Sequence, residues 1–92
     1  MPARIRIRDV LEFLDLDAGS LLEELRREGL FETDELSPGE ADELRVAVAL
    51  MHEMGVNPAG VDVALHLRRR LLYLEDRLRR VLRDLGSSRD FK

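Results

Sequence analysis

Side chains that could carry out covalent chemistry are few in this chain. Its 92 residues include no cysteine, which excludes disulfides, thiolate zinc sites and cysteine nucleophiles. His52 and His66 fall on separate predicted helices, and we expect His66 to lie on the rim of an apolar stripe rather than to bind a metal. No serine forms a nucleophile–base pair, and there is neither a glycine-rich phosphate loop nor a run of metal-spaced carboxylates. We therefore predict a protein that is not an enzyme, with no catalytic residues, metal, cofactor or small-molecule ligand.

Charged residues divide the chain into an acidic first half and a basic second half. Residues 1–43 carry five Arg against thirteen Asp or Glu, a balance of −8. Residues 44–92 carry ten basic and six acidic residues, a balance of +4, and the net charge of the whole chain is −4. Such asymmetry is typical of proteins that select a partner by charge, and two solvated faces would give the same pattern.

Length and hydropathy limit the architecture. A chain of 92 residues and 10.6 kDa is one small domain with a modest core, which a second subunit would help to stabilise. Its apolar runs are too short to span a membrane, and residues 1–4 lack the apolar segment of a secretory signal. The 37% of charged and 4% of aromatic residues are typical of a helical bundle or coiled coil. We expect an all-α protein in the cytoplasm.

Residues 4–36 are predicted to form a helix-turn-helix head with a short wing. Arg and Ile alternate over residues 4–8, which favours a short edge strand. Apolar residues then recur with helical spacing over residues 10–14, and a second helix follows. Leu30 and Phe31 are expected to form a strand that pairs with residues 4–8 in a minimal β-hairpin.

Capping residues mark the ends of the later helices. Asp17 is the expected start of the second helix, and Gly29 its end. Ser37 begins a capping box, with proline next and glutamate three residues on, and Gly55 ends that helix. Asn57 caps a last helix of about 28 residues, roughly 42 Å long. The resulting division is one domain over 1–86, made of the head 4–36, a connecting helix 37–55 and a dimerisation helix 57–85, followed by a disordered tail 87–92.

The last predicted helix carries an apolar seam with the spacing of a coiled coil. Apolar residues follow one another at intervals of three and four over three heptads, with charged residues on both flanks. A helix of this length extends beyond a compact domain, so we expect the same helix of a second chain to cover it. Both a parallel and an antiparallel pair fit the pattern. The predicted dimerisation residues are Ala64, Leu67, Leu71, Leu74, Leu78, Val81 and Leu85.

This order of elements resembles the MerR-type winged helix-turn-helix superfamily, and within it the chaperone-modulator family CbpM. The resemblance covers residues 4–85 and implies binding to the J-domain of a DnaJ/CbpA-type co-chaperone and inhibition of its stimulation of DnaK. The alternatives are a MerR-like DNA-binding transcription regulator of the heat-shock type and a stand-alone dimerisation module. The segments that carry the resemblance are Arg26-Arg27-Glu28-Gly29-Leu30, Leu36-Ser37-Pro38-Gly39-Glu40-Ala41-Asp42-Glu43-Leu44 and Met54-Gly55-Val56-Asn57-Pro58-Ala59-Gly60-Val61.

The charge of the predicted head argues against duplex DNA as its ligand. DNA affinity comes mainly from Lys and Arg, whereas the second helix and the turn after it are rich in carboxylates. An acidic surface suits the basic helix that J-domains expose, as the resemblance implies. An apolar patch on the third and fourth helices is the other docking surface to consider. The predicted partner-binding residues are Glu23, Glu24, Glu28, Glu32, Asp34 and Glu35.

Overall fold

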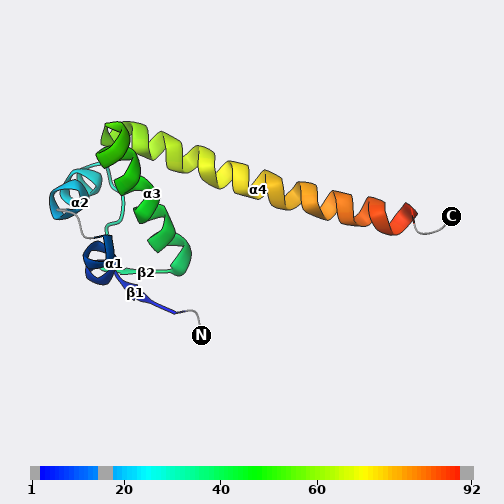
Figure 1. Ribbon diagram of the computed structural model, residues 1–92, viewed down its shortest axis with the longest axis horizontal. Helices are drawn as coiled ribbons and strands as arrows, with labels where there is room; N and C mark the ends of the chain where they lie inside the picture. Colours follow the sequence, from blue (N-terminus) through cyan, green and yellow to red (C-terminus); the bar gives the residue numbers. More distant parts are fainter. Residues whose placement is uncertain (1–2, 15–17, 90–92) are drawn as a thin grey trace.

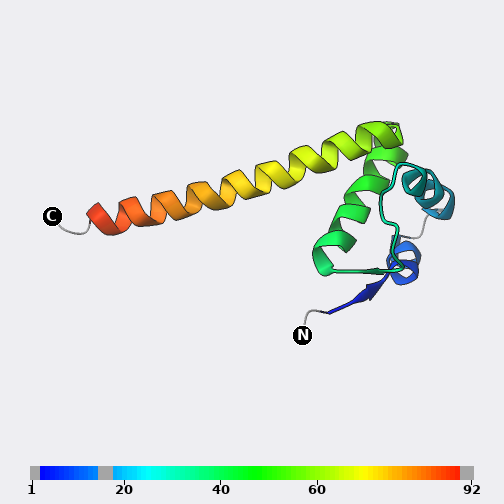
Figure 2. The ribbon, with the colours of Figure 1, turned by 180° about the vertical axis from the view of Figure 1, so that it is seen from behind.

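The computed structural model describes residues 3–14 and 18–89, which form a head and one long helix that projects from it (Figure 1). The molecule measures 59 × 31 × 22 Å, and the projecting helix accounts for most of its length (Figure 2). The elements in chain order are β1 (Ile5–Arg6), α1 (Ile7–Leu14), α2 (Ala18–Arg27), β2 (Glu35–Leu36), α3 (Pro38–Met54) and α4 (Pro58–Arg89). The expectation of a mainly helical chain with a minimal two-stranded sheet is therefore confirmed.

The sheet pairs other residues than the sequence pattern predicted. β1 runs antiparallel to β2, with Ile5 opposite Leu36 and Arg6 opposite Glu35. The expected strand at Leu30 and Phe31 is wrong, because those residues lie in a turn. β1 is also shorter than residues 4–8, since α1 begins at Ile7.

The side chain of Arg26 explains why no strand forms directly after α2. Its Nε donates a hydrogen bond to the carbonyl oxygen of Phe31 at 2.8 Å, and its Nη2 donates to that of Thr33 at 3.4 Å. Phe31 has a φ of 53°, in the left-handed region that bulky residues seldom occupy. The turn is therefore folded back onto the end of α2, and the chain becomes extended only at Glu35.

The predicted helix caps are present at three boundaries. After α2, Gly29 has a φ of 80° and the Leu30 N–H donates to the carbonyl oxygen of Leu25 at 3.1 Å. Ser37 and Glu40 form both hydrogen bonds of the capping box at the start of α3, at 3.0 and 3.1 Å. α3 ends at Gly55 in the left-handed conformation. Asp17, the expected cap of α2, lies outside the described residues.

The connection from α3 to α4 is tightly packed. The side chain of Asn57 accepts a hydrogen bond from the Gly60 N–H at 2.7 Å, which caps α4 as predicted. Val56 and Val61 take the positions of a hydrophobic staple across this cap. A Cβ atom at Gly60 would lie 2.8 Å from a methyl carbon of Val56, so only glycine fits here without a shift. This packing fixes the direction in which α4 leaves the head.

The hydrophobic core belongs to the head and to the first turns of α4. α3 forms its centre and packs against α1, α2 and the start of α4. Val61 and Leu65 of α4 are buried against α3, whereas Leu72, farther along the same side of the helix, is exposed. The buried apolar residues are Ile7, Leu22, Leu25, Leu36, Leu44, Ala47, Val48, Met51, Val61 and Leu65.

α4 continues beyond its expected end. Gly86 and the two serines that follow were predicted to stop the helix, but they are helical and α4 runs to Arg89. A glycine inside a helix costs only about 1 kcal/mol relative to alanine, so one glycine weakens a helix without ending it. The expected disordered tail thus starts inside α4, and the rest of it, 90–92, lies outside the described residues.

Candidate partner-binding surfaces

The exposed side of α2 is acidic, as the sequence predicted. Glu23, Glu24 and Glu28 are exposed, and none of them has an ion-pair partner among residues 3–14 and 18–89. Arg27 is the exposed cation among them, since the side chain of Arg26 is half-buried and turned toward the following loop. This face therefore presents mainly carboxylates to solvent.

The acidic turn after α2 is less acidic than its sequence indicates. Asp34 forms an ion pair with Arg26 at 3.2 Å. Asp34 and Glu35 also border a shallow hollow of about 340 Å³ together with Arg6 and Arg8 of β1 and α1. The predicted partner-binding residues thus form two groups, an acidic face at α2 and a turn of mixed charge. Glu32 is exposed and belongs to the turn.

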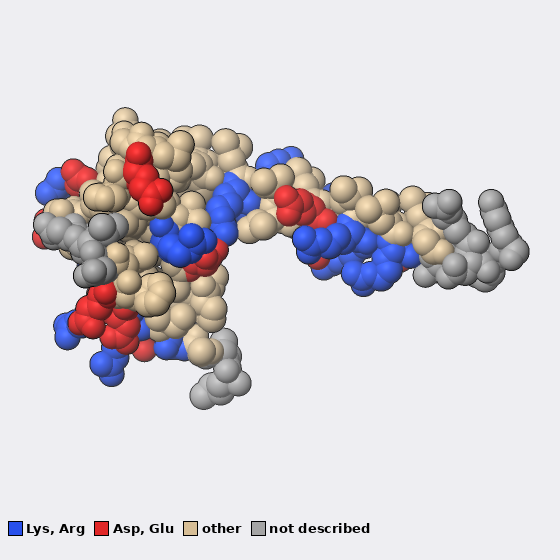
Figure 3. Space-filling view, viewed as in Figure 1, with Lys and Arg blue, Asp and Glu red and all other residues tan. Residues whose placement is uncertain are grey.

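The predicted seam of α4 is exposed from Leu67 onward. Leu67 has 62% of its surface accessible, Leu74 46% and Leu85 55%, and Leu71, Leu78 and Val81 lie in the same range. Ala64 alone is half-buried, next to the head. Figure 3 shows basic side chains gathered along one side of the outer part of α4, beside an uncharged strip. The helix therefore presents a long apolar face that no other residue among 3–14 and 18–89 covers.

Two arginines of α4 tie its first half to α3. Nη2 of Arg68 donates to Oδ2 of Asp42 at 2.6 Å. Arg69 makes two hydrogen bonds with Glu43, at 2.5 and 3.0 Å, and the Glu43 side chain is only 11% exposed. Together with the packed connection between the helices, these contacts hold the angle between α3 and α4. The sequence analysis missed the pairs because their partners are 26 residues apart and no periodicity links them.

Ion pairing also shifts the protonation equilibria of this region. Hydrogen bonding to Arg45, together with the charges of Arg45 and Arg68, lowers the pKa of Asp42. The bond to Glu43 raises the pKa of Arg69 above its ordinary value. At the start of α3, hydrogen bonds from the backbone and hydroxyl of Ser37 lower the pKa of Glu40. All three shifts favour the charged forms, through ion pairs at Asp42 and Arg69 and through the helix cap at Glu40.

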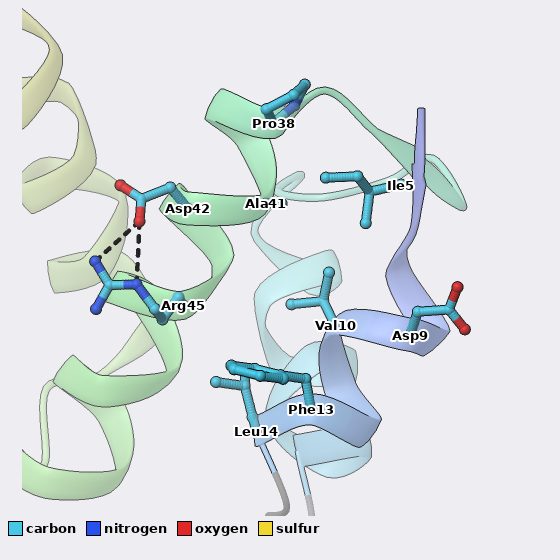
Figure 4. Close-up of a pocket in the computed structure, with 9 residues that line it drawn as sticks. All are labelled: Ile5, Asp9, Val10, Phe13, Leu14, Pro38, Ala41, Asp42 and Arg45. Carbon is cyan, nitrogen blue, oxygen red and sulfur yellow. Dashed lines mark hydrogen bonds and ion pairs between the residues drawn. The ribbon is translucent and has the colours of Figure 1, made fainter. Parts of the chain in front are cut away.

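An apolar groove lies between α1 and the first turns of α3 (Figure 4). Its volume is about 410 Å³, and Val10, Leu14 and Ala41 are among its lining residues. Phe13, which the apolar spacing placed on the same helical stripe as the core residues, is 83% exposed beside this groove. Spacing alone missed this surface, because the period identifies the residues that share a face and gives no information on how deeply each is buried.

His52, His66 and Ser37 are not arranged as a catalytic group in the described residues. Nδ1 of His66 lies 3.1 Å from the carbonyl oxygen of Asp62 and 3.4 Å from its Oδ1, on the exposed side of α4. His52 is exposed in the last turn of α3. Ser37 is occupied by the capping box.

No protein-family model, curated protein or solved structure matches this chain. Within residues 3–14 and 18–89, no three potential ligand side chains lie close enough together to hold a metal ion. In the part of the chain that the structure describes, no helix is long and apolar enough to cross a membrane. The described residues do present three exposed surfaces: the acidic face of α2, the apolar seam of α4 and the groove between α1 and α3.

Proposed function

We propose that this chain is a non-enzymatic modulator of the CbpM type. It binds the J-domain of a DnaJ/CbpA-type co-chaperone in the cytoplasm and inhibits the stimulation of DnaK by that co-chaperone. In this proposal the head is a MerR-like winged helix-turn-helix and α4 is a dimerising coiled coil. The chain runs β1, α1, α2, β2, α3 and a long α4. Two short helices, a minimal sheet, a capped helix and a long last helix are the elements that the resemblance implies, so this arrangement supports the proposal.

The charge of the exposed α2 face is the observation that carries the proposal. A helix that reads duplex DNA needs Arg and Lys to neutralise phosphates, whereas α2 presents Glu23, Glu24 and Glu28 without ion-pair partners in the described residues. A carboxylate face instead attracts a basic protein surface, which increases the rate and the specificity of association. In this proposal the head keeps the architecture of the superfamily, but the charge of its α2 face favours a protein partner over nucleic acid.

A calorimetric titration with the isolated J-domain of the same organism's CbpA-like protein, at low and high salt, tests the proposal. We expect saturable binding that weakens as salt rises, because salt screens exposed charges. Charge reversal at Glu23 and Glu24 should weaken binding about tenfold, which corresponds to ~1.4 kcal/mol. Reversal of Asp76, on the outer part of α4, is the matched control and should leave binding unchanged. Absence of J-domain binding at tens of micromolar would overturn the proposal.

The apolar seam of α4 supports the dimer. Its leucines are about half exposed in the single chain, and the same seam of a second copy would cover them with matching three- and four-residue spacing. Leu74→Asp should convert the dimer into a monomer, because it places a charge in the seam. Leu72→Asp is the matched control, since Leu72 is equally exposed (48% against 46%) but lies off the seam. Light scattering after size exclusion distinguishes them, and a monomeric wild type would remove the dimer from the proposal.

Binding to duplex DNA is the second candidate function. Exposed Arg residues just before and in β1, at the start of α1 and in the outer part of α4 favour it, since each could neutralise a phosphate. A gel shift on duplex DNA whose affinity falls steeply with salt would support a MerR-like regulator. These residues are Arg4, Arg6, Arg8, Arg77, Arg79, Arg80 and Arg83.

A further inference from the structure

The groove between α1 and α3 extends along most of α3. Leu14 and Arg45 line both the groove of about 410 Å³ and a second hollow of about 460 Å³, so the two hollows adjoin along the same side of α3, and we refer to them together as the depression. The depression follows α3 from Pro38 to His52, a rise of about 21 Å at 1.5 Å per residue. It therefore has the length of a helix of about four turns.

The surface of this depression is shaped to receive a helix. Ala41, Arg45 and Ala49 follow one another at four-residue intervals along α3, and the two alanines leave room for another backbone to come close. On the α1 side the groove is walled by Val10, Leu14 and the exposed ring of Phe13 (Figure 4). A large exposed aromatic side chain beside an apolar depression is typical of the anchors of protein interfaces.

The charges around the depression favour a basic occupant. Arg45 binds Asp42, with its Nε and Nη2 3.0 and 2.9 Å from Oδ1, and Arg68 of α4 binds the same carboxylate at Oδ2. Asp9 on α1 and Glu53 near the end of α3 also line the depression, and neither has an ion-pair partner among residues 3–14 and 18–89. The lining thus includes three carboxylates and one arginine, and Asp9 and Glu53 are the two carboxylates to which a basic segment could bind.

We infer that this depression binds an amphipathic helix of the J-domain protein, with an apolar face toward Phe13 and the two alanines and basic residues near Asp9 and Glu53. The inference rests on the proposed function and adds to it the docking site and the chemistry of the docked segment. Helix-in-groove recognition supplies apolar anchors, and the acidic face of α2 then steers the approach. A second copy's α4 has similar chemistry, but its seam has the heptad spacing that an identical seam fits best.

Titration of the full chain with the same isolated J-domain tests the site directly. Phe13→Ala removes the exposed anchor, and Ala49→Leu fills the floor of the depression. Each should weaken binding at least tenfold. Met54→Ala is the matched control, because Met54 is an apolar residue of α3 that is 70% exposed and does not line the depression. J-domain binding that both Phe13→Ala and Ala49→Leu leave unchanged would overturn the docking site and leave the proposed function intact.

A second probe separates failure of the site from failure of the proposed function. The probe is a fluorescent 14-residue helical peptide with leucines on one face and lysines at both ends. Peptide binding that is lost in Phe13→Ala and retained in Met54→Ala supports a helix-binding groove. If the J-domain does not bind while the peptide does, the groove remains supported, but the proposed function and the identity of the occupant are overturned. If neither probe binds, the groove inference is wrong. It is also wrong if Ala49→Leu turns a dimer into a monomer, because a second copy would then be the occupant.

Discussion

The two halves of α4 share one regular helix and differ in what surrounds it. Leu65, in the first half, is 1% exposed and packs against α3, whereas Leu78, in the second half, is 57% exposed. Arg69 in the first half binds the nearly buried Glu43, but Arg80 in the second half binds, within the described part of the chain, only its helical neighbour Asp76. The same residue types therefore stabilise the head at one end of α4 and remain available to a partner at the other.

This difference shows that an apolar repeat in the sequence identifies the residues that share one face of a helix. The repeat does not indicate which segment packs against that face. Two apolar stripes run along α4, and the stripe that starts at Val61 is covered by the chain's own α3 as far as Leu65, whereas Leu72 is exposed. The seam that starts at Ala64 leaves the head after about one turn, and from Leu67 onward its residues are exposed. Matched substitutions in the half of α4 next to the head and in its outer, free half should therefore differ in their effects.

The largest expected difference is between the two leucines. Leu65→Ala should lower the free energy of unfolding by about 3 kcal/mol, because it leaves a cavity in the core. Leu78→Ala should have little effect on a monomer and a concentration-dependent effect on a dimer, since only a second subunit covers it. Urea unfolding at several protein concentrations measures both. Equal, concentration-independent losses would show that α4 is covered along its whole length within one chain.

The two arginines provide the next comparison. Arg69→Ala leaves the Glu43 carboxylate buried without its partner, and we expect a loss of about 2 kcal/mol. Arg80→Ala removes an exposed i,i+4 pair and should cost less than about 0.5 kcal/mol. Thermal unfolding distinguishes these outcomes. If Arg69→Ala is as mild as Arg80→Ala, the ion pairs do not hold α4 against α3.

Two glycines of α4 should respond to the same substitution with opposite signs. Gly60→Ala brings a Cβ atom to 2.8 Å from a methyl carbon of Val56 and 3.2 Å from Oδ1 of Asn57. We expect it to destabilise the protein by about 1 kcal/mol, because the stiff valine must move and the cap of α4 is disturbed. Gly86→Ala meets nothing within 4 Å and should stabilise the helix by up to about 1 kcal/mol. A gain in melting temperature for Gly60→Ala would contradict the packed connection.

Local signals in the sequence predicted local structure well. The capping box at Ser37, the left-handed glycines at the ends of α2 and α3, and the cap at Asn57 depend on residues within a few positions of one another. The position of β2 depends on the side chain of Arg26, which binds the turn after α2. Such a contact is not visible as a period or a propensity, and for this reason the strand was expected at the wrong residues.

The candidate surfaces were predictable only as far as they follow the helical period. The exposed carboxylates of α2 and the seam of α4 follow from spacing and charge. The groove beside Phe13 and the pairs of Arg68 and Arg69 with α3 arise from segments that meet only in the folded chain. Residues 26 positions apart carry no mutual signal in a single sequence, since many other pairings would match their charges equally well.

The smallest predicted effect is a loss of stability at low pH, which we expect from the head and not from the free half of α4. Hydrogen bonds from Ser37 lower the pKa of Glu40 from its ordinary value of 4.5, so the unfolded chain binds this proton more tightly than the folded one. The stabilisation is therefore fully present above about pH 4.5 and is lost as pH falls through the lower, folded pKa. Asp42, whose pKa is lowered chiefly by Arg45, adds to this loss in the same direction.

Glu40→Gln should accordingly reduce the difference in melting temperature between neutral pH and about pH 3, because glutamine can cap the helix but does not titrate. Ser37→Ala should lower stability at neutral pH by about 1 kcal/mol and should also reduce the acid dependence. Asp76→Asn, in the free half of α4, is the control and should leave the acid dependence of the head unchanged, since its only ion pair in the described residues is with Arg80. An acid dependence that persists undiminished in Glu40→Gln would contradict the role of the cap of α3 and would assign the dependence to Asp42, whose pKa is lowered chiefly by its α3 neighbour Arg45 and further by Arg68 of α4.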